Sequence, residues 1–257
     1  MKVRFLGAHN CETDAAGMMC LLVDGRIVLD AGALTRNLPL EDQFGIRAVL
    51  LTHGHYDHFR DIPMLGMNLF LNGRSVDVYG SDDARRALAE HVLNGGIYSR
   101  FFDHPEGSPT LRYHVVEPGT SFRLGDYAVL PVALPHPVPV LGYQLTDASG
   151  RRFFYSGDTG AGLSACFGDI DPHLMAIDVT APSRYTAFFA ARNQHLTPET
   201  LAAELKAFKK LKGHLPPVVC VHMNPHGEAE IAAEIERLSA ELGSPVYLAR
   251  EGLTISV

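Results

Sequence analysis

Three histidines and one aspartate occur within six residues, directly after an apolar run, and this cluster constrains the chain more than any other feature. The run Ala48–Leu51 is typical of a buried strand, so the cluster occupies the loop that leaves its carboxyl end. Residues two apart in extended backbone face the same way, so His53 and His55 can converge on one ion while Asp57 and His58 turn toward another. A lone histidine is more often solvated or hydrogen-bonded, but this combination is a donor set that divalent metals such as zinc accept. The sequence therefore predicts a metal site here.

Short apolar or alternating runs recur along the chain and predict many strands. They are Val3–Leu6, Met19–Val23, Ile27–Leu29, Ala48–Leu51, Val76–Tyr79, Tyr127–Ala133, Arg152–Tyr155, Leu174–Val179, Val218–Val221, Val246–Leu248 and Leu253–Ser256. Helices are expected over Asp82–Leu93, Pro198–Leu211 and Glu228–Leu242, the first two capped by Ser81 and Thr197. This alternation predicts a mixed α/β layer structure.

The composition is acidic, with 22 Lys and Arg against 29 Asp and Glu and a net charge of −7. Broad electrostatic attraction to a nucleic-acid backbone is therefore not expected. Hydrophobic residues make up 46% and charged residues 20%, which is ordinary globular usage. The first residues lead straight into strand-like sequence without a signal-peptide pattern, so we expect a cytoplasmic protein with no membrane partner.

The histidine cluster resembles the H-x-H-x-D-H motif of the metallo-β-lactamase superfamily, which His53, His55, Asp57 and His58 match in full. The resemblance implies an α/β fold, the four-layer αββα metallo-β-lactamase sandwich, formed by residues 1–257 as a single domain. It also implies three further ligands, namely a histidine, an aspartate after a strand, and a final histidine.

Each further ligand has a candidate in the required order. His136 stands between two prolines after an apolar run, although a simple turn histidine would look the same. Asp158 lies in a Ser-Gly-Asp-Thr stretch that resembles the family's G-D-T segment. His222 follows the run Val218–Val221 and is preferred to His226, which sits in the next turn.

The resemblance implies that two divalent ions are bound, zinc in the first place and manganese or iron as alternatives. One ion would be held by His53, His55 and His136, the other by Asp57, His58 and His222, with Asp158 bridging. Such a pair lowers the pKa of a bridging water and supplies hydroxide at neutral pH. The chain is thus expected to be a metal-dependent hydrolase.

Two later residues favour one branch of the superfamily. His195, in Asn-Gln-His-Leu-Thr-Pro, resembles the loop of ribonuclease Z and related phosphodiesterases that brings a histidine to the scissile phosphate, so it is the candidate acid. Asp178 takes the place of the glutamate in the family's H-E-A-T segment and could orient His195, although a buried aspartate capping a turn is an equal alternative. We group Asp57 with these two as the catalytic residues.

The substrate is expected to be a small phosphodiester such as a cyclic nucleotide, as in the class II cyclic-nucleotide phosphodiesterases. Ribonuclease Z carries a long tRNA-gripping arm between the third histidine motif and the bridging aspartate. Only 22 positions separate His136 from Asp158, so tRNA is not an expected partner. The segment from Tyr98 to Tyr113 could cover the metals, although a solvated loop is favoured. A homodimer would fit the family.

Three other readings stay open. Acyl, thioester or lactone hydrolysis would use the same metals without an acid on a phosphate. Persulfide dioxygenases keep the motif but use one iron, and the second set of ligands argues against them. A non-catalytic metal-binding scaffold is opposed by the complete ligand sets, since a scaffold needs no open water position.

Overall fold

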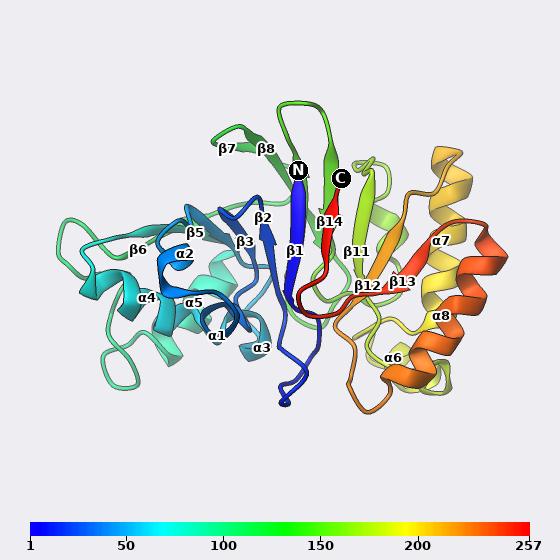
Figure 1. The fold of residues 1–257 in the computed structure, drawn as a ribbon, viewed down its shortest axis with the longest axis horizontal. Coiled ribbons are helices and arrows are strands. Elements are labelled where there is room, and N and C mark those ends of the chain that lie inside the picture. The colour runs from blue at the N-terminus through cyan, green and yellow to red at the C-terminus, as the bar shows by residue number, and fades with distance from the viewer.

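Two seven-stranded mixed sheets face each other in the computed structural model, which describes residues 1–257 (Figure 1). The first sheet has the order β14 (Thr254–Ser256), β1 (Lys2–Gly7), β2 (Cys20–Val23), β3 (Ile27–Leu29), β4 (Ala48–Leu50), β5 (Val76–Gly80) and β6 (Leu111–Val115). The second has the order β13 (Val246–Leu248), β12 (Val218–Val221), β11 (Leu174–Asp178), β10 (Arg152–Tyr155), β9 (Val140–Thr146), β8 (Tyr127–Leu134) and β7 (Phe122–Leu124).

Helices cover the outer face of each sheet and complete four layers (Figure 1). Beside the first sheet lie α1 (Leu34–Asn37), α2 (Leu40–Gln43), α3 (Tyr56–Phe59), α4 (Ile62–Leu71) and α5 (Asp82–His91). Beside the second lie α6 (Thr186–Ala190), α7 (Pro198–Lys212) and α8 (Glu228–Leu242), with 3-10 turns at Leu163–Cys166 and Ser183–Tyr185. The predicted αββα sandwich is confirmed. No helix is both long and apolar enough to cross a membrane.

Alternation within the strands produces two hydrophobic cores. In β2, Leu21 and Val23 belong to a core of 43 buried residues, part of which lies between the two sheets. Leu22 belongs to a second core of 21 buried residues, which lies under the helices of the first sheet. In β4, Leu50 and Val49 divide in the same way. Strands buried on both faces need continuous apolar sequence, which is why these runs are recognisable.

The predicted helices are confirmed with small changes at their ends. The first ends at His91 rather than Leu93, the second continues to Lys212, and the third keeps both bounds. The Ser81 hydroxyl accepts the Ala84 N–H at 3.2 Å, and Thr197 forms a capping box at the start of α7. Local capping chemistry therefore sets these helix starts.

Several elements were not predicted. Helix α4 is almost wholly apolar and lacks the polar face that gives a helical period, and β6 is interrupted by the polar residues Arg112 and His114. These elements depend on tertiary burial more than on local pattern.

Candidate metal centre

The loop after β4 forms one side of the candidate site. Thr52 and His53 continue from the buried strand, and His55, in extended conformation, occupies the position directly before the one-turn helix α3. That helix contains Asp57 and His58. His53 and His58 are fully buried, while His55 and Asp57 are half-buried. The turn into α3 thus gathers all four donors of the motif at one edge of the first sheet.

The second sheet and its connections supply five residues from five separate places along the chain. His136 follows β8, Asp158 follows β10, Asp178 ends β11, His195 precedes α7 and His222 follows β12. Strands β10, β11 and β12 are parallel, and β8 runs in the same direction because both β8 and β10 are antiparallel to β9. Their carboxyl ends therefore meet at one edge, where open α/β sheets build their sites.

Asp158 lies between two groups of donors. Its Oδ2 is 3.5 Å from His53 Nε2 and 3.9 Å from His136 Nε2. Its Oδ1 is 3.0 Å from His58 Nε2 and 3.2 Å from His222 Nε2. Donor atoms lie within 4.8 Å of one another in the group His53, His55, His136 and Asp158, and also in the group Asp57, His58 and His222. One carboxylate thus faces both groups, one oxygen toward each.

Hydrogen bonds behind His53 and His58, the two buried histidines of the first sheet, fix the orientation of their rings. His58 Nδ1 donates to Asp30 Oδ2 at 2.7 Å. The Thr52 hydroxyl donates to the same oxygen at 2.8 Å, so it can only accept from His53 Nδ1, 3.0 Å away. Both rings therefore carry a proton on Nδ1, which leaves the Nε2 lone pair for the centre.

The histidines of the second sheet are also oriented by hydrogen bonds from Nδ1. His136 Nδ1 donates to the Gln194 carbonyl at 2.7 Å. The Thr180 hydroxyl donates to Asp178 Oδ1 at 2.7 Å and accepts from His222 Nδ1 at 2.7 Å. These contacts again direct Nε2 inward, as is usual for histidines that bind metals.

Buried polar atoms at the centre lack hydrogen-bond partners. His53 Nε2, His58 Nε2 and Asp158 Oδ1 are all buried and unsatisfied. Such groups are costly unless an ion or water satisfies them. A divalent cation would satisfy all three, and both groups offer the mixture of imidazole and carboxylate that such cations accept. The residues present therefore fit the metals that the fold family implies.

The ionisation of the cluster is strongly perturbed. Burial raises the pKa of Asp158, but the charges of His222, His58 and His53 outweigh it and hold that pKa well below its usual range. Burial lowers the pKa of His222, but Asp158, Asp178 and Asp57 together raise it to about 10. The carboxylates therefore favour positive charge at this centre, which is the charge that a bound cation would supply.

His195 lies beside both donor groups. Its Nδ1 donates to Asp178 Oδ2 at 2.8 Å, and its ring centroid is 5.0 Å from that of His222 and 5.3 Å from that of His136. Burial raises the pKa of the fully buried Asp178, but the charge and hydrogen bond of His195 lower it overall. Asp178 is therefore an ionised anchor for His195.

The structure brings all nine predicted site residues together. They are His53, His55, Asp57, His58, His136, Asp158, Asp178, His195 and His222. His226 is exposed and belongs to neither donor group. The segment from Tyr98 to Tyr113 packs beside α4, where Phe101 is buried and the Tyr98 hydroxyl donates to Met64 Sδ.

The supporting residues Asp30, Thr52 and Thr180 were not predicted from the sequence. Asp30 is fully buried, has a φ of 56° and accepts three side-chain hydrogen bonds, from Thr52, His58 and Tyr155. Its position after a buried strand resembles that of Asp158 and was an available signal. His222 also has a positive φ, 67°, and such strain is maintained where the surrounding structure over-determines it.

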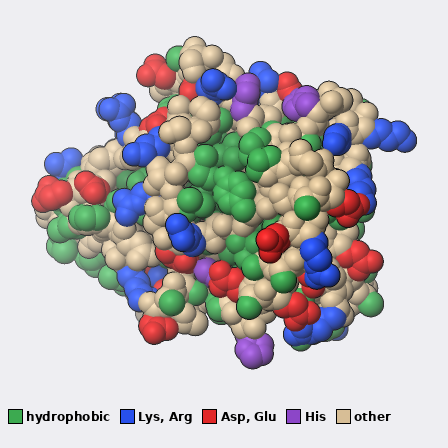
Figure 2. All heavy atoms as spheres, turned by 45° about the vertical axis from the view of Figure 1, so that its right-hand side comes forward, with side chains coloured by type: hydrophobic (Ala, Val, Ile, Leu, Met, Phe, Trp, Pro, Cys, Tyr) green, Lys and Arg blue, Asp and Glu red, His purple; other side chains and the backbone are tan.

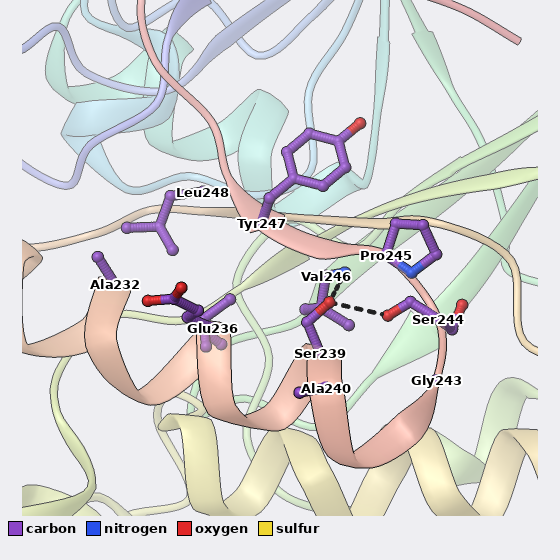
Figure 3. Close-up of a pocket in the computed structure, with 11 residues that line it drawn as sticks. Ala232, Glu236, Ser239, Ala240, Gly243, Ser244, Pro245, Val246, Tyr247 and Leu248 are labelled. Carbon is purple, nitrogen blue, oxygen red and sulfur yellow. Dashed lines mark hydrogen bonds between the residues drawn. The ribbon is translucent and has the colours of Figure 1, made fainter.

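A separate hollow of about 680 Å³ lies between α8 and the edge strand β13 (Figure 3). Its lining includes Ile235, Val246 and Leu248 but no histidine. Figure 2 turns this side of the molecule forward and shows an apolar patch bordered by charged side chains, with only scattered histidines. The hollow is therefore distinct from the metal centre.

Residues 25–236 match a protein family described as "Beta-lactamase superfamily domain". Among curated proteins, ribonuclease Z of Thermococcus kodakarensis is 29% identical over 143 residues, covering 53% of this chain and 42% of the relative. An uncharacterised protein of Mycobacterium leprae is 35% identical over 144 residues, covering 52% of this chain and 48% of the relative. The matched stretches thus span less than half the length of these relatives.

Solved structures match over the whole chain at low sequence identity. Unliganded yeast PDE1 has a TM-score of 0.82 at 16% identity, covering 100% of this chain and 99% of the other. The metallo-β-lactamase fold protein YhfI from Bacillus subtilis has a TM-score of 0.76 at 15% identity, covering 99% and 98%. These similarities establish the fold of the chain.

Proposed function

The chain belongs to the β-lactamase superfamily, and we propose that it is a binuclear-metal-dependent phosphodiesterase that hydrolyses small phosphodiesters such as cyclic nucleotides. The observation that carries the proposal is the position of Asp158, whose two oxygens face two separate donor groups. One carboxylate shared in this way suits two ions that act on one substrate.

The chain's own residues would hold the metals and position the acid. His53, His55 and His136 would bind one divalent ion, Asp57, His58 and His222 the other, and Asp158 both. When bound, the ions would supply a hydroxide at neutral pH and stabilise negative charge on the phosphate. Zinc is the first expectation because borderline-soft ions favour imidazole.

His195 would donate the proton that an alkoxide leaving group needs. Its Nδ1 is occupied by Asp178, so the Nε2 face is the one available to a substrate beside the donor groups. The hydrogen bond to Asp178 fixes the orientation of the ring. Asp57 contributes through its contact with His222 Nε2 at 3.1 Å, which places it in the second donor group.

Two observations support a small substrate over tRNA. The stretch from His136 to Asp158 is filled by β9, β10 and their turn, which leaves no room for an arm. The net charge of −7 gives no general attraction to a polyanion. The relatives named ribonuclease Z are therefore similar in sequence to this chain without defining its substrate.

The test is metal-dependent hydrolysis of bis(p-nitrophenyl) phosphate by protein reconstituted separately with zinc and with manganese. A p-nitrophenyl carboxyl ester and a thioester serve as comparison substrates, and Asp158→Ala serves as the metal-site control. We expect phosphodiester turnover that Asp158→Ala abolishes. Turnover of the ester or thioester alone would replace the proposal with an acyl hydrolase, and no turnover with full metal loading would favour a scaffold.

A further inference from the structure

A pocket of about 380 Å³ adjoins the metal centre and shares His195 with it. It opens between the loop after β11, the short helix α6 and the loop after β12. Its size lies within the range of about 300 to 1,000 Å³ that is usual for small-molecule sites. Figure 1 shows α6 at the same edge of the sandwich as α3, which carries Asp57 and His58. A molecule bound at the donor groups would therefore reach this pocket.

Three aromatic side chains form one part of the pocket. They are Tyr185, Phe188 and Phe189. Tyr185 and Phe188 are 42% and 51% exposed, and α6 contains no buried residue, so these rings do not serve the hydrophobic core. The Phe189 ring lies edge-on to His195 with centroids 5.4 Å apart, and Phe188 meets Phe189 at 5.4 Å. The rings thus lead outward from the proposed acid.

Polar groups complete the pocket without adding negative charge. Asn10, Gln194 and Asn224 are among its lining residues, and no carboxylate is. The buried Oδ1 of Asn10 has no hydrogen-bond partner. Side-chain amides offer both hydrogen-bond donors and acceptors, so they suit a ligand with polar groups better than a purely aliphatic ligand.

We infer that this aromatic pocket, comprising Tyr185, Phe188, Phe189 and the three amides, binds the base of a nucleotide whose phosphate lies at the metal centre. The inference rests on the proposed function and names its substrate class as nucleobase-bearing phosphodiesters. Aromatic rings stack on bases, and amides recognise the edges of bases by hydrogen bonds. Phe188 and Tyr185 are then specificity-determining residues, with no part in bond cleavage.

The test measures binding of adenosine 5′-monophosphate and of methyl phosphate to the zinc-loaded protein by calorimetry. The two probes share a phosphate monoester and differ in the nucleoside. We expect the nucleotide to bind at least about tenfold more tightly, and Phe188→Ala to remove about tenfold of that affinity while leaving methyl phosphate unchanged. Tyr185→Ala should act in the same direction.

Phe70→Ala is the matched control, because Phe70 is 42% exposed on α4 and lines a different hollow. It should alter the affinity for neither probe. Equal affinity for the two probes, or an equal loss in Phe70→Ala and Phe188→Ala, would overturn the inference. Selective nucleotide binding without turnover of bis(p-nitrophenyl) phosphate would refute only the proposed function, whereas turnover without nucleotide preference would refute only the pocket.

Discussion

The two sheets contribute to the metal centre in different ways. The first supplies four donors from one loop and a single turn of helix, so their relative positions are set by local backbone geometry. The second supplies four residues at the ends of β8, β10, β11 and β12, which meet at one edge, and His195 from the loop before α7. One half of the site is therefore local, and the other depends on the tertiary structure.

Buried hydrogen bonds join the two halves behind the site. The Tyr155 hydroxyl, from β10, donates to Asp30 Oδ2 at 2.8 Å, and the Tyr143 hydroxyl, from β9, donates to the Leu51 carbonyl at 2.8 Å. Gly157 has a φ of 61°, and a side chain there would place its Cβ 2.7 Å from that of Thr52. These contacts hold the residues of the second sheet in place against the loop after β4.

The largest expected effect is that of Asp158→Asn, and Asp57→Asn is the variant with which it is compared. Asp158 contacts both donor groups and Asp57 contacts only one, so we expect Asp158→Asn to lower phosphodiester kcat/KM by about 10³-fold or more and to reduce the bound metal further than Asp57→Asn does. Metal content by mass spectrometry and steady-state kinetics measure both effects. Equal metal loss in the two variants would show that Asp158 is not shared.

His195→Ala should have the next largest effect, and its size should depend on the leaving group. An alkoxide needs a proton and p-nitrophenolate does not, so we expect a loss of roughly 10²-fold or more for a cyclic nucleotide and a much smaller one for bis(p-nitrophenyl) phosphate. Asp178→Asn should show the same pattern more weakly, because the amide oxygen of asparagine can still accept the hydrogen bond from His195 Nδ1. An equal loss on both substrates would assign His195 to binding.

The difference between the halves also explains what could be predicted from the sequence. His53, His55, Asp57 and His58 were recognisable because their spacing alone carries the geometry. His136, Asp158 and His222 could be ordered only by resemblance to a family, since no local pattern reports which strands end side by side. The αββα layers followed from the same resemblance together with the apolar runs.

The remaining features depend on contacts between distant residues. Asp30 lies 28 positions from His58, to which it is hydrogen-bonded, and Thr180 lies 42 positions from His222. The aromatic pocket is likewise formed by α6, whose short sequence has no strong helical period. Such positions are fixed by the packing of the sheets and are invisible to a reading of local pattern.

The supporting hydrogen bonds give a smaller test of the two halves. Asp30→Asn weakens the anchors of His58 and His53, and we expect metal affinity to fall about 10- to 100-fold. Thr180→Val removes a neutral hydroxyl behind His222 and should cost less, because Asp178 remains near that ring at 3.6 Å. Competition with a chelator measures both affinities. If Thr180→Val lowered metal affinity more than Asp30→Asn does, the stronger supporting hydrogen bonds would lie in the second sheet, contrary to this expectation.

The smallest expected effect concerns His9, which ties the loop after β1 to the other end of the chain. Its Nδ1 is 2.7 Å from Glu251 Oε1, and its Nε2 is 3.2 Å from Glu228 Oε2. Burial lowers the pKa of His9, but the hydrogen bonds and charges of Glu251 and Glu228 outweigh it and raise that pKa. The protonated ring therefore stabilises the fold fully below the unfolded-state pKa of about 6.5, and the contribution is lost as pH rises through the raised value.

His9→Gln should consequently lower the free energy of unfolding by about 1 kcal/mol at low pH and by less at high pH. Urea unfolding of wild type and variant at pH 6 and pH 9, in the same metal state, measures the difference and cancels the titration of the metal centre. His226→Gln is the control, since His226 is exposed and forms no ion pair. If the loss of unfolding free energy in His9→Gln grew toward pH 9, His9 would act as a neutral hydrogen-bonding group. Its contacts with Glu251 and Glu228 would then stabilise the fold without an ion pair.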